Sequence, residues 1–348
     1  MSTIKLLSEN QKVNKIICIH HDKNSNKVDY KIKQYEKVIF FKRSENEFLD
    51  IFNLLNKFKP QITYISGWQD FTYVKALRKY RKKNKTISVC GIDDQWWGKP
   101  RQVAGFIYFK FFLSSLYDFY WISGKPQYEY VRRLGAKSEK IIYNLYSADN
   151  KIFKKSTMNT KRFIFLGRFA RYKALDMLIK VYTSLDKKVQ KQWPLVLIGD
   201  GEMKKEILKL KNKNIFLKGV LSPEQINDEL NKGGVGCFVS HRDQWGVAIQ
   251  EFALKGLPLI VSSAAGAASE FVISDYNGYL FKRSDKTSLR DALMKIIKKS
   301  DDELNIFSKR SYNLAKRINP EQSAYSLLSV LHNNNFKVDK SLFDFPEY

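Results

Sequence analysis

Short apolar runs alternate with amphipathic segments along most of the chain. In the first half, five such runs predict strands at residues 15–20, 37–41, 62–66, 86–90 and 119–123. The helical periodicity between them is clearest at residues 47–58, around 75–78 and at 127–134. Strands that alternate with helices predict a parallel α/β sheet with helices on its faces.

The second half continues this alternation and places cations directly after a strand. Residues 163–166 form a buried apolar run, which is followed by the loop Gly-Arg-Phe-Ala-Arg-Tyr-Lys and then by an amphipathic segment. Gly167 lets the backbone turn sharply, while Arg168 supplies a forked cation and Lys173 a point charge. Because open α/β sheets bind ligands at the carboxyl ends of their strands, we interpret this loop as a diphosphate site. The alternative is a solvated basic loop.

A pair of carboxylates, Asp243 and Glu251, lies between two further apolar runs in the spacing Asp-x7-Glu. In one continuous helix their side chains would point about 80° apart. We therefore expect Asp243 to precede a helix that Gly246 opens and that contains Glu251. The amides of Gly246, Val247 and Ala248 would then be free at the helix N-terminus, where phosphate binds readily.

These motifs occur in an ordered series that resembles a known family. The blocks, besides the Asp-x7-Glu segment, are FLGRFARYKALDMLI, LVLIGDGEMKKEI, IFLKGVLSPEQI, GLPLIVSS, GAASEFV and NGYLF. Together they resemble the donor-nucleotide domain of the retaining family-four glycosyltransferases of GT-B fold. The resemblance implies that Asp243 faces the donor sugar, that Glu251 binds the ribose, and that the Arg168 and Lys173 pair holds the diphosphate. The resulting candidates are Arg168, Lys173 and Asp243 for catalysis, and Gly167, Gly199, Val220, His241, Gly246, Val247, Ala248 and Glu251 for donor binding.

The sequence departs from the family pattern at three places. Asp243 stands where the family usually has glutamate, so the sugar must lie closer to the backbone or be approached through water. Trp245 replaces a phenylalanine, and its alternative role is to pack under the loop. After the first strand, residues 20–24 read His-His-Asp-Lys-Asn instead of a glycine-rich loop. The cations and the helix at Gly246 would therefore carry most of the phosphate binding.

The loop at residues 91–98 is the candidate for acceptor binding. It offers Asp93 and Asp94, which can orient sugar hydroxyls, and Trp96 and Trp97, whose indole faces can stack on a pyranose ring. The alternative is that the tryptophans plug the edge of the domain and an aspartate caps the next helix. Residues 67–70, Gly-Trp-Gln-Asp, are a weaker candidate of the same kind.

The composition is typical of a soluble α/β protein with a basic surface. The chain has 348 residues, 44% of them hydrophobic, and a net charge of +26. The excess is +13 in each half, with 27 basic and 14 acidic residues over 1–150 and 34 and 21 over 151–348. Such a surface could attract an anionic membrane, whereas no motif for specific nucleic-acid recognition accompanies it. Cys18, Cys90 and Cys237 lie in or beside apolar runs, so we expect reduced core thiols.

No targeting signal or membrane span is predicted. The most apolar stretch, residues 103–117, is interrupted by Lys110 and two serines. We expect it to be a helix buried between sheet and surface, with lipid contact along one side as the alternative. The expected location is the cytoplasm, including peripheral contact with the inner face of the cell membrane.

The sequence thus predicts two Rossmann-like domains facing across a cleft, over residues 1–155 and 156–318. Residues 319–348 would return to the first domain as a helix and tail. The expected reaction is retaining transfer of a hexose from a nucleoside-diphosphate sugar to a glycan or lipid-linked glycan, without a cofactor or metal ion. The alternatives are a transferase or phosphorylase acting on a soluble small molecule, a silent nucleotide-sugar-binding module, and nonspecific binding of nucleic acid.

Overall fold

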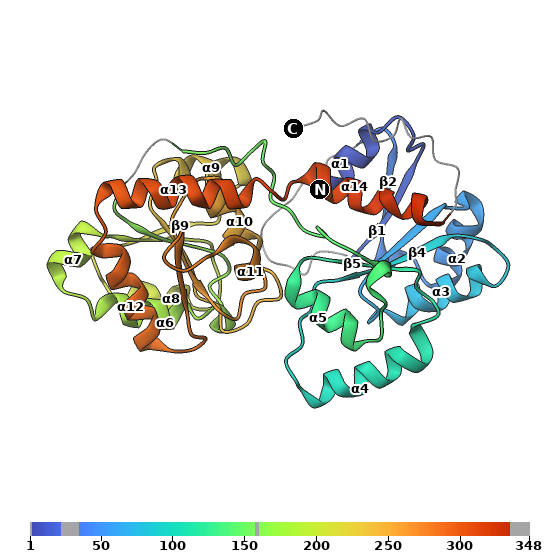
Figure 1. The fold of residues 1–348 in the computed structure, drawn as a ribbon, viewed down its shortest axis with the longest axis horizontal. Helices are drawn as coiled ribbons and strands as arrows, with labels where there is room; N and C mark the ends of the chain where they lie inside the picture. The colour runs from blue at the N-terminus through green and yellow to red at the C-terminus, as the bar shows by residue number, and fades with distance from the viewer. Residues whose placement is uncertain (1, 22–34, 157–159, 335–348) are drawn as a thin grey trace. The chain divides into compact units, whose positions relative to one another are not determined.

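The computed structural model describes residues 2–21, 35–156 and 160–334, which fold into two compact units (Figure 1). The first unit comprises Met1–Ser123, Gln127–Leu145 and Pro320–Tyr348, and the second comprises Gly124–Pro126 and Tyr146–Asn319. The long continuous part of the second unit begins at Tyr146, whereas the sequence predicts a boundary after residue 155. The chain re-enters the first unit at Pro320.

The second unit is built on a six-stranded parallel sheet with the strand order β12-β11-β10-β7-β8-β9. The strands are β7 (Phe163–Leu166), β8 (Leu195–Ile198), β9 (Ile215–Gly219), β10 (Val235–Phe238), β11 (Leu259–Ser262) and β12 (Gly278–Phe281). The helices are α6 (Leu175–Thr183), α7 (Lys187–Gln192), α8 (Lys204–Lys209), α9 (Pro223–Asn231), α10 (Val247–Leu254), α11 (Ala268–Phe271), α12 (Lys286–Ile297) and α13 (Asp301–Ala315), with a 3₁₀ turn η4 at Arg171–Lys173.

Helices cover both faces of this sheet because successive strand residues point to opposite sides. Phe163 and Phe165 of β7 belong to a buried cluster with Leu178 of α6. Ile164, which lies between them, packs in a second cluster with Phe252 of α10. The predicted parallel α/β architecture is thus confirmed for this unit.

The first unit contains two parallel sheets, one of β1 and β2 and one in the order β3-β4-β5-β6. The strands are β1 (Ile16–His20), β2 (Val38–Lys42), β3 (Ile62–Ser66), β4 (Ile87–Ile92), β5 (Phe119–Ile122) and β6 (Ile141–Ile142). The helices are α1 (Ser2–Glu9), α2 (Phe48–Phe58), α3 (Phe71–Arg81), α4 (Pro100–Tyr108) and α5 (Lys125–Arg133), with 3₁₀ turns η1 (Arg43–Glu45) and η3 (Ser138–Lys140) and a π-helical segment η2 (Phe109–Leu113). The five strands and three helices predicted for this half are all confirmed.

The C-terminal helix α14 (Pro320–Leu328), followed by the 3₁₀ turn η5 (Ser329–Asn334), belongs to the first unit and packs against α1. This confirms the expected return of the chain to its N-terminal part. The predicted tail contact, from residue 336 onwards, lies outside the described residues.

The apolar stretch at residues 103–117 differs from its prediction. It forms the end of α4 and then η2, but no residue of α4 is buried. Only the later part, with Phe109 and Leu113, enters the core. The expectation of a helix buried between sheet and surface is therefore wrong for α4. Within the part of the chain that the structure describes, no helix is long and apolar enough to cross a membrane.

Candidate functional site

Three glycines bring the carboxyl ends of β7, β8 and β9 close together. The Gly167 amide donates to the Ile198 carbonyl at 3.0 Å, and the Gly199 amide donates to the Gly219 carbonyl at 2.8 Å. Gly199 has a φ of +136°, and a Cβ at this position would clash with the carbonyl of Gly167. Glycine is therefore required at position 199, where the backbone after β8 packs directly against the backbone after β7. Val220 follows β9 and is exposed.

The two predicted phosphate-binding cations lie at this edge and differ in their exposure and in their contacts. Arg168 is exposed, and its guanidinium has no hydrogen bond or ion pair to any described residue. Lys173 ends the turn η4, is only 18% exposed, and forms a short ion pair with the carboxylate of Asp243. Its ammonium also lies 5.2 Å from the ring centroid of Phe238. Arg168 is thus available, whereas Lys173 is held in place.

The Asp-x7-Glu segment has the predicted local structure. Gly246 is the N-cap of α10 with a φ of +96°, which favours glycine, and Glu251 lies within the helix. A Cβ on Gly246 would also lie 2.8 Å from the ring of Phe238. The amides of Gly246, Val247 and Ala248 have no acceptor among the residues with described positions. Free amides at this terminus, with the positive end of the helix dipole, suit an anion.

The loop that carries Asp243 is fixed from both sides. On one side the His241 amide donates to the carbonyl of Tyr172 at 2.9 Å, which joins it to the loop of Lys173. On the other side the Gly266 amide donates to the carbonyl of Asp243 at 3.3 Å. The structure therefore brings together the predicted residues that follow β7 with those that follow β10.

Glu251 is a partly buried carboxyl that makes no hydrogen bond or ion pair within the described part of the chain. Burial raises its pKa to about 7, because nothing compensates the charge of the ionised form. Glu229 provides a contrast within the same unit. It is also buried, but hydrogen bonds from Lys232 and Arg162 outweigh the burial and lower its pKa. Glu251 therefore retains its full capacity to accept hydrogen bonds from a ligand.

Gln250, which the sequence analysis did not single out, holds α10 in place. Its side chain is fully buried, accepts a hydrogen bond from the Ala148 amide at 2.7 Å, and donates to the carbonyls of Ala315 and Ile318 at 3.1 and 2.6 Å. Apart from Glu251, Gln250 is the only polar residue of the helix VAIQEFAL, and this is the signal that could have identified it. These bonds fix the helix that presents Glu251.

His241 and Trp245 have contacts within the second unit. His241 Nδ1 lies 2.9 Å from the hydroxyl of Ser284. Trp245 is 2% exposed and packs edge-to-face against Phe271 with ring centroids 6.2 Å apart. These contacts favour the packing role of Trp245 under the loop over direct contact with a sugar.

The candidate acceptor loop follows β4 in the first unit. Trp96 stacks on Tyr130 with centroids 6.2 Å apart, and the guanidinium of Arg133 lies 5.4 Å from its ring centroid. Trp96 therefore packs on the core, as its alternative role requires. The N-cap of α4 is Lys99, so neither Asp93 nor Asp94 caps this helix.

The other residues of the acceptor loop, and those of the weaker candidate, also have structural contacts. The Asp94 carboxylate accepts a hydrogen bond from the Gln95 amide at 3.0 Å, and the Trp97 amide donates to Gln102 at 2.7 Å. Asp70 caps α3 and pairs with Arg43 at 2.9 Å. Asp70 therefore has a structural role.

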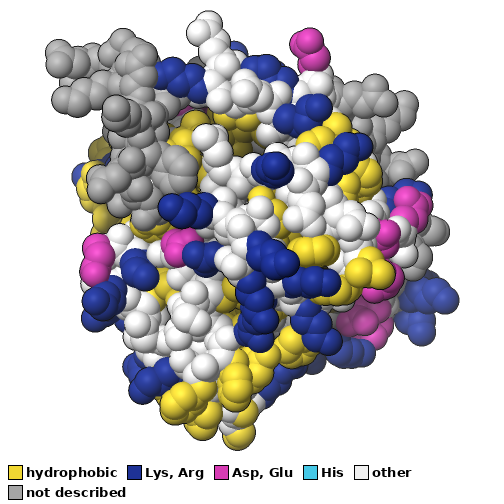
Figure 2. Space-filling model, turned by 90° about the vertical axis from the view of Figure 1, so that its right-hand side faces the viewer, with side chains coloured by type: hydrophobic (Ala, Val, Ile, Leu, Met, Phe, Trp, Pro, Cys, Tyr) yellow, Lys and Arg dark blue, Asp and Glu magenta, His cyan; other side chains and the backbone are white. Residues whose placement is uncertain are grey.

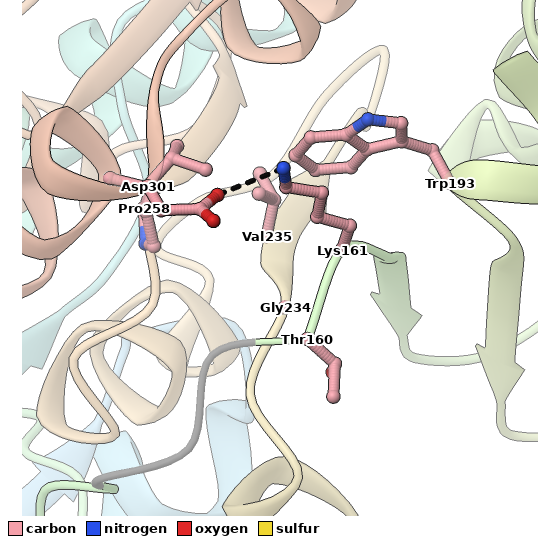
Figure 3. Close-up of a pocket in the computed structure, with 8 residues that line it drawn as sticks. Thr160, Lys161, Trp193, Gly234, Val235, Pro258 and Asp301 are labelled. Atoms are coloured by element: carbon pink, nitrogen blue, oxygen red, sulfur yellow. Dashed lines mark ion pairs between the residues drawn. The ribbon is translucent and has the colours of Figure 1, made fainter.

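A small pocket lies at the opposite end of the same sheet (Figure 3). It is lined by Thr160, Lys161, Trp193, Gly234, Val235, Pro258, Asp301 and Leu304. Val235 is the first residue of β10, and Pro258 immediately precedes β11. Lys161 and Asp301 form an ion pair at 2.9 Å across it. The pocket is therefore at the amino ends of the strands, away from the candidate site.

Comparison with known proteins gives a family match and several relatives. Residues 148–314 match the family Glycosyl transferases group 1. A curated relative is the GalNAc-α-(1→4)-GalNAc-α-(1→3)-diNAcBac-PP-undecaprenol α-1,4-N-acetyl-D-galactosaminyltransferase of Campylobacter jejuni, which is 23% identical over 56% of this chain and 54% of its own length. The chain spans about half the length, or less, of the curated relatives it matches.

Solved structures show the same fold. Anabaena HepE in complex with UDP superposes with a TM-score of 0.69 at 15% identity, over 85% of this chain and 86% of that one. Sucrose-phosphate synthase from Thermosynechococcus elongatus gives a TM-score of 0.72 at 14% identity, over 95% and 92% of the two chains. The chain thus has the GT-B fold of two Rossmann-like units, and its residues 148–314 are similar to the family Glycosyl transferases group 1.

Proposed function

We propose that the chain is a retaining family-four glycosyltransferase that moves a hexose from a nucleoside-diphosphate sugar to a hydroxyl of a glycan. The observation that carries this proposal is the carboxyl Glu251, unpaired within the described residues and one turn inside a helix whose N-terminal amides are free. An ionised carboxylate can accept hydrogen bonds from ribose hydroxyls, and free helix amides can donate hydrogen bonds to phosphate oxygens. Both groups occur on one helix, at the sheet edge that carries Arg168.

The diphosphate would bind between the amides of α10 and the cations of the β7 loop. Arg168 can take a bidentate position on phosphate oxygens without breaking any contact with the described residues. The ammonium of Lys173 would bind the phosphate, and its ion pair with Asp243 would weaken as a result. Asp243 could then accept hydrogen bonds from hydroxyls of the donor sugar, so that one ligand satisfies both members of the pair.

In the proposed reaction, the bond between the anomeric carbon and the phosphate oxygen breaks while the acceptor hydroxyl forms a new bond on the same face of the sugar. Negative charge develops on the leaving diphosphate, where Arg168, Lys173 and the helix amides stabilise it. A phosphate oxygen takes the proton of the acceptor hydroxyl. The scheme requires no side-chain nucleophile, and we propose that it needs no metal ion or cofactor.

Uridine nucleotides and lipid-linked glycans are the first substrates to test. The solved Anabaena neighbour contains UDP, and the name of the Campylobacter relative specifies an undecaprenyl diphosphate-linked acceptor. We propose an acceptor of this class, in surface polysaccharide or lipid-linked oligosaccharide synthesis at the cytoplasmic face of the membrane. Asp93, Asp94 and Trp97 remain the candidates for contact with it, whereas the packing of Trp96 on Tyr130 favours a structural role for that residue.

A thermal-shift panel of UDP-, GDP- and ADP-sugars tests the donor site directly, since a ligand that binds only the folded state raises the melting temperature. We expect one nucleotide class to stabilise the protein and the shift to disappear in Glu251→Gln. The matched control is Glu129→Gln, which alters an exposed carboxyl on α5. If no nucleotide sugar stabilises or is hydrolysed by the wild-type protein, the proposal is wrong.

The acceptor alternatives are separated by two assays on the same preparation. Activity toward a soluble sugar without any lipid would favour a small-molecule transferase. Consumption of inorganic phosphate with release of a sugar phosphate would identify a phosphorylase. Donor binding without either transfer or hydrolysis would leave a silent nucleotide-sugar-binding module.

A further inference from the structure

We propose that α4 and the following segment η2 form a surface that docks on an anionic lipid bilayer. The docking surface consists of Val103, Ile107, Phe111 and Phe112. This inference goes beyond the proposed glycosyl transfer and does not depend on it. It rests on the first unit alone.

The docking surface is an apolar stripe that no described residue covers. Val103, Ile107 and Phe111 are 44%, 50% and 72% exposed and follow one another at intervals of four residues, and Phe112 beside them is 58% exposed. Residues at this spacing share one face of a helix. In Figure 2 hydrophobic side chains gather at the lower end of the first unit, where α4 lies in Figure 1. An isolated exposed side chain is ordinary, whereas a contiguous apolar stripe indicates an interaction site.

The π-helical turn explains why two phenylalanines are exposed together. The Ser114 amide donates to the Phe109 carbonyl at 2.9 Å, a separation of five residues instead of four. Phe109 and Leu113, four residues apart, share the face that enters the core, where each is fully buried. The wider turn rotates Phe112 farther from that face than a regular α-helical turn would. Phe111 and Phe112 are consequently left on the outer side. Such π turns are frequently found at functional sites.

The segment that carries the docking surface has only basic charges. Residues 95–117 contain Lys99, Arg101 and Lys110 and no aspartate or glutamate. All three cations are exposed, and Arg78 of α3 donates to the carbonyl of Phe112 at 2.6 Å. A helix with large apolar side chains on one side and cations at its margin is typical of segments that lie in the plane of a membrane interface.

This charge favours a bilayer over a second copy of the chain. A symmetric contact through the docking surface would place the same basic margins against each other, and like charges held close together repel. Anionic headgroups would instead attract Lys99, Arg101 and Lys110, while the phenylalanines enter the boundary of the acyl chains. A bilayer therefore complements both the apolar stripe and its margin.

Co-sedimentation of the full chain with vesicles tests the proposal. Vesicles of phosphatidylcholine are compared with vesicles that also contain about 30% phosphatidylglycerol, an anionic fraction large enough to give a negative surface potential. We expect binding to the anionic vesicles, weakened at least about tenfold by Ile107→Gln combined with Phe111→Gln. Glutamine keeps the helix propensity of these positions. The matched control is Phe216→Gln, which removes an exposed phenylalanine of β9 in the second unit.

A second pair of variants tests the charges. Arg101→Gln with Lys110→Gln should weaken binding to anionic vesicles, and the same exchange at Lys209 and Lys213 of the second unit should not. All variants are checked for an unchanged melting temperature, so that loss of binding cannot be assigned to unfolding. The donor-induced thermal shift should also be unchanged, which separates this test from that of the donor site.

Three results would overturn the proposal. The wild-type protein could fail to sediment with anionic vesicles, or the Ile107 and Phe111 variant could bind them as well as the wild type does. Sedimentation velocity could instead show a wild-type dimer that this variant converts to a monomer. That last result would assign the docking surface to a second copy of the chain.

Discussion

At the scale of single residues, the buried Glu229 and the partly buried Glu251 have opposite electrostatic environments. Glu229 is surrounded by Arg162 and Lys232 and is stabilised in its ionised form. Glu251 has no such partner in the described structure, and its pKa is raised to about 7. Leaving one buried carboxyl uncompensated reduces stability, and such a cost is typical of a group kept for a ligand.

Glu251→Gln should therefore stabilise the unliganded protein at alkaline pH. The folded-state pKa of about 7 exceeds the ordinary value of 4.5. As pH rises from 4.5 through 7, the unfolded chain ionises this group first, and the folded state loses stability relative to it. The loss approaches about 3 kcal/mol above pH 8. Urea unfolding at pH 5 and pH 8.5 should show a gain for the variant only at the higher pH, and an equal effect at both would contradict the assignment.

Nucleotide binding should strengthen as pH rises through the pKa of Glu251. Ribose hydroxyls donate to a carboxylate better than to a protonated carboxyl, so binding releases a proton from Glu251 when the pH is below about 7. Calorimetry of nucleotide binding in two buffers of different ionisation enthalpy measures that proton. Glu251→Gln should bind weakly and without proton release, whereas Glu129→Gln should behave as the wild type.

Arg168 and Lys173 should matter for turnover more than their neighbour Arg171. Replacing either by alanine removes a charge from the leaving diphosphate, and we expect turnover at saturating donor to fall at least about tenfold. Arg171, an exposed residue of the same loop that pairs with Glu206, is the matched control and should tolerate alanine. Near-normal turnover in both the Arg168 and Lys173 variants would exclude this role.

At the scale of elements, α10 connects the candidate site to the places where the chain joins the two units. Gln250 binds the backbone at Ala148 and at Ala315 and Ile318, close to both ends of the second unit. Without Gln250, the Ala148 amide and the carbonyls of Ala315 and Ile318 would each lose this hydrogen bond. The site residue Glu251 is thus positioned by its neighbour in the same helix.

Gln250→Leu should destabilise the protein by about 3 kcal/mol or more, because it leaves one amide and two carbonyls without their hydrogen bonds. Equilibrium unfolding in urea measures the change. Gln192→Leu, which alters an exposed glutamine at the end of α7, provides the control. A loss below about 1 kcal/mol would mean that water replaces the glutamine without cost.

The elements also show where sequence reasoning succeeds. Five strands and three helices of the first half, and the start of α10 at Gly246, follow from local periodicity and the steric freedom of glycine. The structure of residues 103–117 differs from the prediction because their apolar side chains lie on two faces, and periodicity does not say which face is covered. The π turn at Phe109–Leu113 decides that question.

At the scale of the whole molecule, the net charge of +26 destabilises the folded state through repulsion between like charges. We expect the melting temperature to rise as NaCl increases from about 0.02 to 0.2 M, since the screening length shortens over this range. KCl should act equally, because screening depends on ionic strength. A melting temperature that does not change with salt would show that local ion pairs already offset the excess charge.

The sequence by itself determined the parallel α/β class, the place of the Asp-x7-Glu segment at the start of a helix, and the cations after β7. These follow from local periodicity and motif spacing, which need no knowledge of distant contacts. Only the tertiary structure decided that Lys173 pairs with Asp243, that Gln250 holds α10, and that Glu251 has no partner among the described residues. It also showed that Trp96 packs on the core and that Phe111 faces outward. Partners and burial are set by residues far apart in the chain, so no local pattern specifies them.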